Sequence, residues 1–179
     1  GYPACMNPNA RSSLQGVVFD AYGTLFDVYS VGALAEELFP GMGAKLAECW
    51  RDTQIGYSRV RTLSQRYAPF SRITRDALRY ACARCGLALT PAIEASLMEA
   101  YDWLHTFADV VPALDGLRAM GLRTAILSNG DPPMLAAAVG NAGLGRLLDH
   151  VISVDAVQRF KTAPEVYALA PAAFGCRAD

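Results

Sequence analysis

The stretch that decides the fold is residues 17–27, VVFDAYGTLFD. Its first three residues form a short β-branched and aromatic run that is typical of a buried strand, and Asp20 closes that run. Gly23 and Thr24 then begin a turn. In an open parallel sheet, ligands bind beyond the carboxyl ends of the strands. We therefore expect Asp20 to face a ligand crevice, where a carboxylate can act as a nucleophile, a metal ligand or a general base.

Two further strand-like runs are also followed by chemically useful side chains. Residues 122–127 predict a second strand that ends at Ser128, and residues 150–154 predict a third strand whose following loop carries Lys161. Helical segments separate these runs, and alternation of helices and strands favours a parallel, doubly wound sheet. Ser128 and Lys161 should therefore meet Asp20 in a single crevice.

A long helical block separates the first strand from the rest of the α/β pattern. We expect helices over residues 31–39, 44–66 and 74–85, and a fourth that begins at Thr90-Pro91. Proline and glycine residues separate them, namely Pro40, Gly41, Gly43, Pro69 and Gly86. The block contains no convincing strand between residues 31 and 105, so it should be an all-helical insertion that covers the carboxyl ends of the strands. Further helices are expected over 112–120, from Asp131-Pro132 to Ala142, and from Pro164, where Pro171 should kink or end the helix.

The expected organisation is an α/β protein with a Rossmann-like parallel sheet core and an inserted all-helical cap. The core would comprise residues 14–27 and 109–179, and the cap residues 28–108. Residues 1–13 should be an extension that is disordered or left from an expression vector.

Composition narrows the possible functions. Of the 179 residues 53% are apolar and 18% are charged, which suits a folded domain with a substantial core. The formal net charge is −1 and there is no basic run, so binding to nucleic acid or to a membrane surface has no electrostatic support. No apolar run reaches membrane-spanning length, and the N-terminal segment lacks the apolar region of a secretory signal. The scattered cysteines, described next, make a reducing, cytoplasmic location the default expectation.

The cysteines do not predict a disulfide framework, because their number is odd and they are scattered. They are Cys5, Cys49, Cys82, Cys85 and Cys176. Cys82 and Cys85 form a CxxC pair, but no second pair accompanies them, so zinc binding has weak support. Buried apolar thiols are the favoured interpretation, and a metal or redox pair is the alternative.

Taken together, VVFDAYGTLFD (17–27), AILSNG (125–130) and RFKTAPEVY (159–167) resemble the motifs of the haloacid dehalogenase superfamily. More narrowly, they resemble its type II (S)-2-haloacid dehalogenase branch. WRDTQIGYSRVRTLSQRY (50–67) resembles the arginine-bearing cap helix of that branch, and the resemblance extends over nearly all of residues 14–174.

The resemblance implies a role for each residue that matches a family motif. Asp20 would be the nucleophile, with Thr24 bonded near it and the Lys161 cation beside it. The Ser128 hydroxyl and nearby backbone N–H groups would bind the substrate carboxylate, and Tyr167 would lie near the active site. Each residue also has a plainer alternative. Asp20 could end a strand by bonding to the turn, and Ser128 could cap the next helix. Lys161 could be a solvated loop lysine, and Tyr167 could serve packing alone.

The cap and the turns supply the remaining site residues of the resemblance. Arg51 matches the arginine that accepts the halide, with an ordinary surface arginine as the alternative. Tyr22, Ile55 and Phe70 fall where the family builds an apolar pocket around the substrate chain, although each could be simple core. Asn129 belongs to the same substrate-binding set, although shaping the turn is its simpler role.

Tyr22 decides between reaction types. Family members that transfer phosphate carry an acid at this position, two residues after the nucleophile, to protonate the leaving group. A halide is a very weak base and needs no proton, so an aromatic residue there favours dehalogenation. No metal and no cofactor are implied, because the acid that helps to hold magnesium in the phosphatases is missing.

The expected reaction converts a short (S)-2-haloalkanoate into the (R)-2-hydroxyalkanoate and halide through an ester on Asp20. The resemblance also suggests a homodimer. The alternatives are another hydrolase of the superfamily, a phosphatase or phosphonatase, and a non-catalytic truncated homologue.

Two features depart from the family pattern. A fourth motif of serine, asparagine and aspartate should follow a further strand, but the sequence stops at Asp179 before any such strand. We therefore expect the sequence to be a truncated form of a longer protein. Asp52 stands where an uncharged polar residue is expected, and it could weaken or reshape halide binding.

Overall fold

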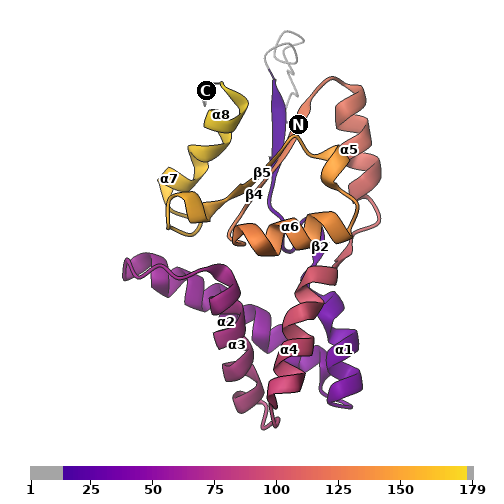
Figure 1. Ribbon diagram of the computed structural model, residues 1–179, viewed down its shortest axis with the longest axis vertical. Coiled ribbons are helices and arrows are strands. Elements are labelled where there is room, and N and C mark those ends of the chain that lie inside the picture. Colours follow the sequence, from indigo (N-terminus) through magenta and orange to yellow (C-terminus); the bar gives the residue numbers. More distant parts are fainter. Residues whose placement is uncertain (1–13, 177–179) are drawn as a thin grey trace, which may run out of the picture.

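The computed structural model describes residues 14–176. The segment 1–13, expected to be an extension, lies outside the described residues. Figure 1 shows a sheet flanked by helices and, below it, a separate layer of helices that comes from the segment between the first two core strands. The predicted fold class, a parallel sheet core with an inserted helical cap, is confirmed.

The core sheet has three parallel strands in the order β1-β4-β5. They are β1 (Gly16–Phe19), β4 (Arg123–Ser128) and β5 (His150–Ser153). Phe19 pairs with Ile126, and Ser128 pairs with Ser153. Because the strands run in the same direction, Asp20 and Ser128 leave the sheet at the same edge.

Helices cover both faces of this sheet, with α5 on one side and α8 on the other (Figure 1). The core helices are α5 (Val110–Ala119), α6 (Pro132–Asn141), α7 (Pro164–Tyr167) and α8 (Leu169–Phe174). The expected interruption near Pro171 is confirmed, because the helix that begins at Pro164 ends at Tyr167 and a new one starts at Leu169. Pro171 thus lies in the first turn of α8, where its missing N–H costs no helical hydrogen bond.

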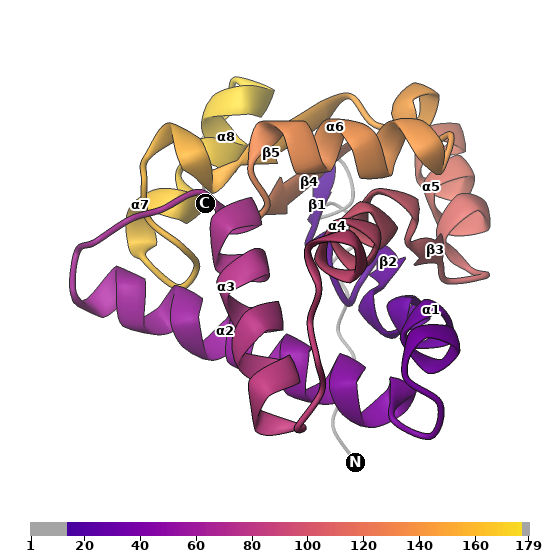
Figure 2. The ribbon, with the colours of Figure 1, turned by 60° about the horizontal axis from the view of Figure 1, so that its bottom comes forward.

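The cap consists of four α-helices, which lie together in front of the sheet edge in Figure 2. They are α1 (Val31–Leu38), α2 (Gly43–Leu63), α3 (Phe70–Arg84) and α4 (Pro91–Ala100). Thr90 caps α4 as expected, with its hydroxyl accepting a hydrogen bond from the Ile93 N–H at 3.2 Å. The expected start of α3 at Thr74 is wrong. The helix begins four residues earlier, at Phe70, because Pro69 serves as its extended N-cap residue.

Residues 31–104 contain no strand, as expected, but a short strand begins at His105, the last residue of the helical block. A two-stranded antiparallel ladder joins β2 (Phe26–Asp27) to β3 (His105–Thr106), where the chain enters and leaves the cap. Strands of two residues are too short to show an alternating pattern, so sequence periodicity could not reveal them. Short 3₁₀ turns complete the described chain at Val28–Ser30, Tyr101–Trp103, Gly145–Leu147 and Val154–Ala156.

The CxxC pair lies at the end of α3. Cys82 is buried in the hydrophobic core, and this burial raises the pKa of its thiol to about 11. Between residues 14 and 176, no group of three or more His, Cys, Asp or Glu side chains is arranged to hold a metal ion. Within the same range, no helix is both long and apolar enough to cross a membrane.

Candidate active site

A small cavity of about 170 Å³ lies between the carboxyl ends of the core strands and the cap. It is lined by Asp20, Tyr22, Arg51, Ile55, Ser58, Arg59, Phe70, Ser128, Asn129, Lys161 and Thr162. The structure therefore brings together all the site residues expected from the sequence except Thr24 and Tyr167. It also adds three lining residues that the sequence did not single out, Ser58, Arg59 and Thr162.

Asp20 and Lys161 form an ion pair at the centre of this cavity. The Lys161 Nζ lies 2.9 Å from Asp20 Oδ1 and also donates to the Leu127 carbonyl oxygen. The Asp20 side chain is 42% exposed, whereas that of Lys161 is 19% exposed. The lysine is thus fixed by the strand β4, while the carboxylate keeps an open side toward the cavity.

The turn after β4 holds Ser128 and Asn129 next to this pair. The buried Ser128 Oγ accepts a hydrogen bond from the Gly130 N–H at 3.1 Å, which leaves its own hydroxyl proton free to donate into the cavity. The Asn129 side-chain oxygen accepts from the Lys161 backbone N–H at 2.9 Å. Gly130 has no room for a side chain, because a Cβ there would lie 2.8 Å from the Tyr22 ring. Asn129 therefore links two core loops, and the glycine allows the turn to pass close to the cavity wall.

Arg51 reaches the cavity from α2 and is held by neutral oxygen atoms. Its Nη2 donates to the Tyr22 carbonyl oxygen at 2.9 Å, and its Nη1 donates to Gln54 Oε1 at 2.8 Å. Gln54 is fully buried and donates in turn to the Thr74 hydroxyl of α3 at 2.7 Å. Sequence reasoning missed Gln54, although its position one helical turn after Arg51 was a usable signal.

Aromatic rings form the apolar wall of the cavity. The Tyr22 ring, 3% exposed, is stacked on Phe70 at 6.1 Å and tilted against Phe26 and Tyr101 at 6.2 Å each. Burial is the largest cause of a raised pKa for the Tyr22 phenol, and nearby Asp131 raises it further. The phenol is therefore neutral, and its oxygen has no hydrogen-bond partner among the described residues.

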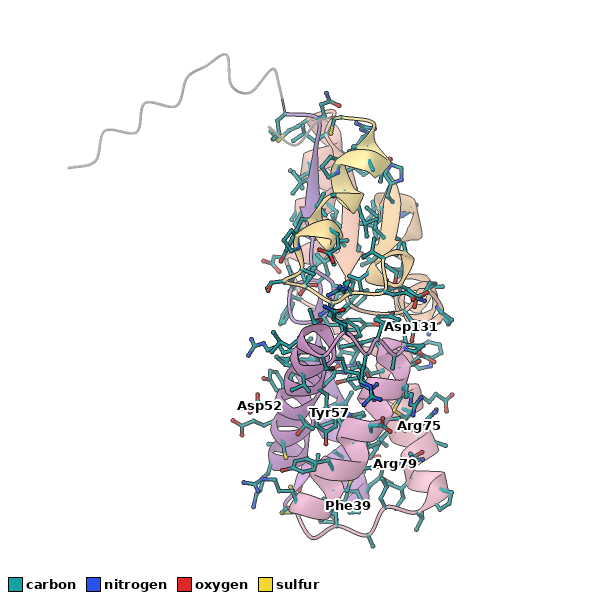
Figure 3. All side chains as sticks on the ribbon, turned by 90° about the vertical axis from the view of Figure 1, so that its left-hand side faces the viewer. Phe39, Asp52, Tyr57, Arg75, Arg79 and Asp131 are labelled. Atoms are coloured by element: carbon teal, nitrogen blue, oxygen red, sulfur yellow. The ribbon has the colours of Figure 1, made fainter. Side chains whose placement is uncertain are left out.

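Two of the hydrogen bonds that fasten the cap to the core are accepted by core carboxylates. Asp131 Oδ2 accepts from the Ser71 backbone N–H of α3 at 2.8 Å, and the Tyr67 hydroxyl donates to Asp155 Oδ1 at 2.7 Å. Figure 3 shows Asp131 at the level where the core meets the cap helices. Both carboxylates come from loops that follow core strands, so the sheet that positions the nucleophile also positions the cap.

Three residues discussed from the sequence lie away from the cavity. Thr24 is exposed, and its backbone N–H donates to the Ala21 carbonyl oxygen. Tyr167 is 49% exposed on α7. Asp52 is exposed on the outer side of α2 (Figure 3), where it lines a different surface depression. The Asp52 carboxylate is therefore not part of the cavity that contains Arg51.

A parallel sheet whose first strand ends in a lysine-paired carboxylate, covered by a helical insertion, defines a capped α/β protein with a carboxylate-centred site. The chain belongs to the family of haloacid dehalogenase-like hydrolases, whose pattern it matches over residues 14–178.

Its relatives place it near one branch of this family. It is 44% identical to the (S)-2-haloacid dehalogenase of Pseudomonas sp. (strain YL), over 90% of this chain and 70% of that protein. It is 45% identical to the (S)-2-haloacid dehalogenase of Xanthobacter autotrophicus, over 90% of this chain and 63% of that protein.

Solved structures agree with these relatives. An L-2-haloacid dehalogenase of 58% identity superimposes with a TM-score of 0.89, over 93% of this chain and 75% of that one. The L-2-haloacid dehalogenase of Xanthobacter autotrophicus with chloropropionic acid covalently bound has a TM-score of 0.86 and 44% identity, over 92% of this chain and 66% of that one.

Proposed function

We propose that the protein hydrolyses the carbon–halogen bond of short (S)-2-haloalkanoates and releases the (R)-2-hydroxyalkanoate and halide. The observation that carries this proposal is the partly open Asp20 carboxylate, which is paired with Lys161 in a cavity that Arg51 of the cap and apolar side chains also line. The two named relatives are (S)-2-haloacid dehalogenases, and one similar structure holds chloropropionic acid covalently. A buried phenol at position 22, where the phosphate-transferring alternative needs an acid, also favours a leaving group that requires no proton.

In the first step, an oxygen of Asp20 attacks C2 of the substrate from the side opposite the halogen. A C–O bond forms while the carbon–halogen bond breaks, so C2 is inverted and becomes an ester of Asp20. The halide carries the electron pair toward Arg51, whose guanidinium is held by Tyr22 O and Gln54 and has no carboxylate partner among the described residues. The positive charge at Arg51 would stabilise the halide as it forms.

In the second step, water attacks the carbonyl carbon of the Asp20 ester. The bond that breaks joins the Asp20 carbonyl carbon to the ester oxygen. The oxygen bound to C2 stays with the product, and C2 keeps its inverted configuration. One proton of the water goes to the leaving alkoxide oxygen, which becomes the product hydroxyl, the other goes to solvent, and the Asp20 carboxylate is restored beside Lys161. Water oxygen therefore enters the enzyme carboxylate and reaches the product only in a later turnover.

The carboxylate of the substrate would bind beside the turn after β4. The Ser128 hydroxyl can donate there, and Lys161 supplies a cation that Leu127 and Asp20 hold in place. Tyr22, Ile55 and Phe70 would surround the carbon chain and exclude water from the attacking carboxylate. This arrangement would orient nucleophile, C2 and halogen in one line.

The test is halide release from each enantiomer of 2-chloropropionate, without added metal. We expect release from the (S) enantiomer alone. Asp20→Asn should abolish it, whereas Asp52→Asn, which removes a carboxylate outside the cavity, should retain it. Intact-mass measurement during turnover should show an adduct on wild-type protein and none on Asp20→Asn. Phosphate release from phosphate esters in the presence of magnesium, without halide release, would contradict the proposal.

We also infer a cytoplasmic homodimer. Val60 and Leu63 near the end of α2 and Trp103 after α4 are 62%, 84% and 63% exposed, and large exposed apolar side chains commonly mark protein contacts. Light scattering after size exclusion should give twice the monomer mass, and a monomer at micromolar concentration would contradict the dimer.

A further inference from the structure

Arg59 is a cavity residue to which the proposed reaction gives no role. Arg51, Ile55 and Arg59 are four residues apart along α2, and all three line the same cavity. This spacing places them on one face of the helix. With a rise of 1.5 Å per residue, the backbone of Arg59 lies about 6 Å beyond Ile55 and about 12 Å beyond Arg51.

The cavity holds more positive charge than the proposed reaction needs. Of the lining residues that the structure describes, Arg51, Arg59 and Lys161 are cations and Asp20 is the one carboxylate. A substrate with a single carboxylate adds one negative charge, and the sum remains one positive charge. That sum does not change during the first step. Asp20 loses its negative charge when it becomes an ester, and the halide that forms carries one negative charge.

Arg59 is the cation that remains without a partner. Lys161 pairs with Asp20, and Arg51 is bonded to Gln54 and to the Tyr22 carbonyl oxygen. For Arg59, by contrast, no ion pair or hydrogen bond of the side chain is formed with any residue from 14 to 176. The residue is exposed, so its guanidinium is available at the edge of the cavity.

We propose that Arg59 adapts this site to 2-halo acids that carry a second carboxylate at the far end of the carbon chain. This inference rests on the proposed dehalogenation and names a substrate class for it. The chain of such a diacid would pass the apolar side chain of Ile55 and bring its distal carboxylate to Arg59. A guanidinium can bind a carboxylate through two parallel hydrogen bonds, which makes arginine well suited to this recognition.

The test compares diacids with monoacids of the same carbon number. Halide release is measured for (S)-2-chlorosuccinate and (S)-2-chloroglutarate, and for (S)-2-chlorobutanoate and (S)-2-chloropentanoate. The proteins are the wild type, Arg59→Gln, and Arg61→Gln as the control, because Arg61 lies on the same helix but does not line the cavity.

We expect Arg59→Gln to lower kcat/KM for at least one diacid by about tenfold or more, the size of a lost hydrogen bond to a charged group. The loss should appear mainly in KM, because the distal carboxylate is bound equally in the ground state and the transition state. The monoacids should change by less than about twofold, and Arg61→Gln should leave all four substrates unchanged. Calorimetry should show that succinate binds the wild type more tightly than butanoate does, and that Arg59→Gln removes this difference.

An equal loss on diacids and monoacids would overturn the inference, since Arg59 would then attract any anion. If the monoacids are turned over and the diacids are not, the inference about Arg59 is overturned while the proposed function stands. No halide release from any of the four substrates, or from 2-chloropropionate, would instead refute the proposed function.

Discussion

At the level of single residues, the surroundings of Arg51 are the most informative part of the site. Its hydrogen bonds go to an amide oxygen and a carbonyl oxygen, which fix the guanidinium without neutralising it. A carboxylate partner would have fixed it equally well but would have cancelled the charge that a departing halide needs. Orientation without neutralisation is therefore the property that Gln54 contributes.

This property predicts the effect of changing Gln54. We expect Gln54→Leu to lower kcat for (S)-2-chloropropionate by about tenfold, because Arg51 loses one of two orienting hydrogen bonds. We expect Gln54→Glu to lower it further, because a carboxylate would compete with the halide. Thr53→Val is the matched control, since the neighbouring Thr53 hydroxyl bonds to Cys49 O, away from Arg51.

Product inhibition separates positioning from a merely structural role. Chloride should inhibit Gln54→Leu more weakly than it inhibits the wild type, because halide affinity depends on the position of the Arg51 guanidinium. An unchanged inhibition constant for chloride, accompanied by a lower unfolding temperature, would show that Gln54 acts through stability alone.

At the level of secondary structure, Asp131 connects two helices in two layers. Its Oδ1 accepts from Met134 N–H in the first turn of α6, and its Oδ2 accepts from Ser71 N–H in the first turn of α3. One side chain thus caps a core helix and a cap helix at once. Both helix N-termini favour the negative charge of this carboxylate.

We expect Asp131→Ala to lower the free energy of unfolding by about 2 kcal/mol, because two backbone N–H groups, one buried and one partly buried, lose their acceptor. Thr90→Ala is the comparison, since Thr90 caps α4 alone, and it should cost about 1 kcal/mol. Urea unfolding followed by circular dichroism measures both. Equal losses for the two variants would contradict the double role of Asp131.

The loop before β5 makes stability depend on pH. The Thr124 backbone N–H donates to Asp149 Oδ2 at 2.8 Å, and this bond, helped by Arg118, holds the pKa of Asp149 below its usual value. A carboxylate with a lower pKa in the folded state stabilises the protein above its unfolded pKa of about 3.9, and this stabilisation is lost as the pH falls through the folded pKa.

Asp149→Asn should therefore be less stable than the wild type at pH 7, and the difference should shrink as the pH falls below about 4. Urea midpoints at several pH values test this expectation. A difference between the two proteins that stays constant down to low pH would rule out the linkage.

The sequence revealed those elements whose signals are local. Helices α1, α2 and α4 and the three parallel strands follow from periodic apolar residues bounded by glycine, proline and capping residues. Strand ends placed Asp20, Ser128 and Lys161 together, because parallel strands share one carboxyl edge. The ladder of β2 and β3 is too short for a periodic signal.

The contacts of the candidate site were harder to predict, because they depend on how α2 packs against α3. The bond between Gln54 and Thr74 joins two helices whose relative rotation no local pattern specifies. The motif positions of Thr24 and Tyr167 correspond to exposed sites in the structure. A motif match fixes the place of a residue in the chain, but the direction of its side chain is a property of the packed molecule.

At the level of the whole molecule, charge is distributed unevenly. The formal net charge is −1, yet three cations and one carboxylate are the charged residues among the described lining of the cavity. A concave site of one sign attracts ligands of the opposite sign, and dissolved salt screens this attraction. Association with anionic halo acids should therefore depend on ionic strength.

We expect kcat/KM for (S)-2-chloropropionate to fall severalfold as ionic strength rises from about 0.01 M to 0.5 M. A halide-free salt avoids inhibition by added product. Arg61→Gln should follow the wild type, because Arg61 does not line the cavity. A kcat/KM that is independent of ionic strength would contradict electrostatic attraction.

The short ladder of β2 and β3 has a consequence for how proteins of this kind can change. Asp27 pairs with His105, so the chain departs for the cap and returns from it at neighbouring points. Everything between these points is a cassette whose two ends are already joined side by side. A different cassette, grafted at the same two positions, would bring new side chains over Asp20 without rebuilding the sheet, and evolution or a designer could diversify substrates in this way.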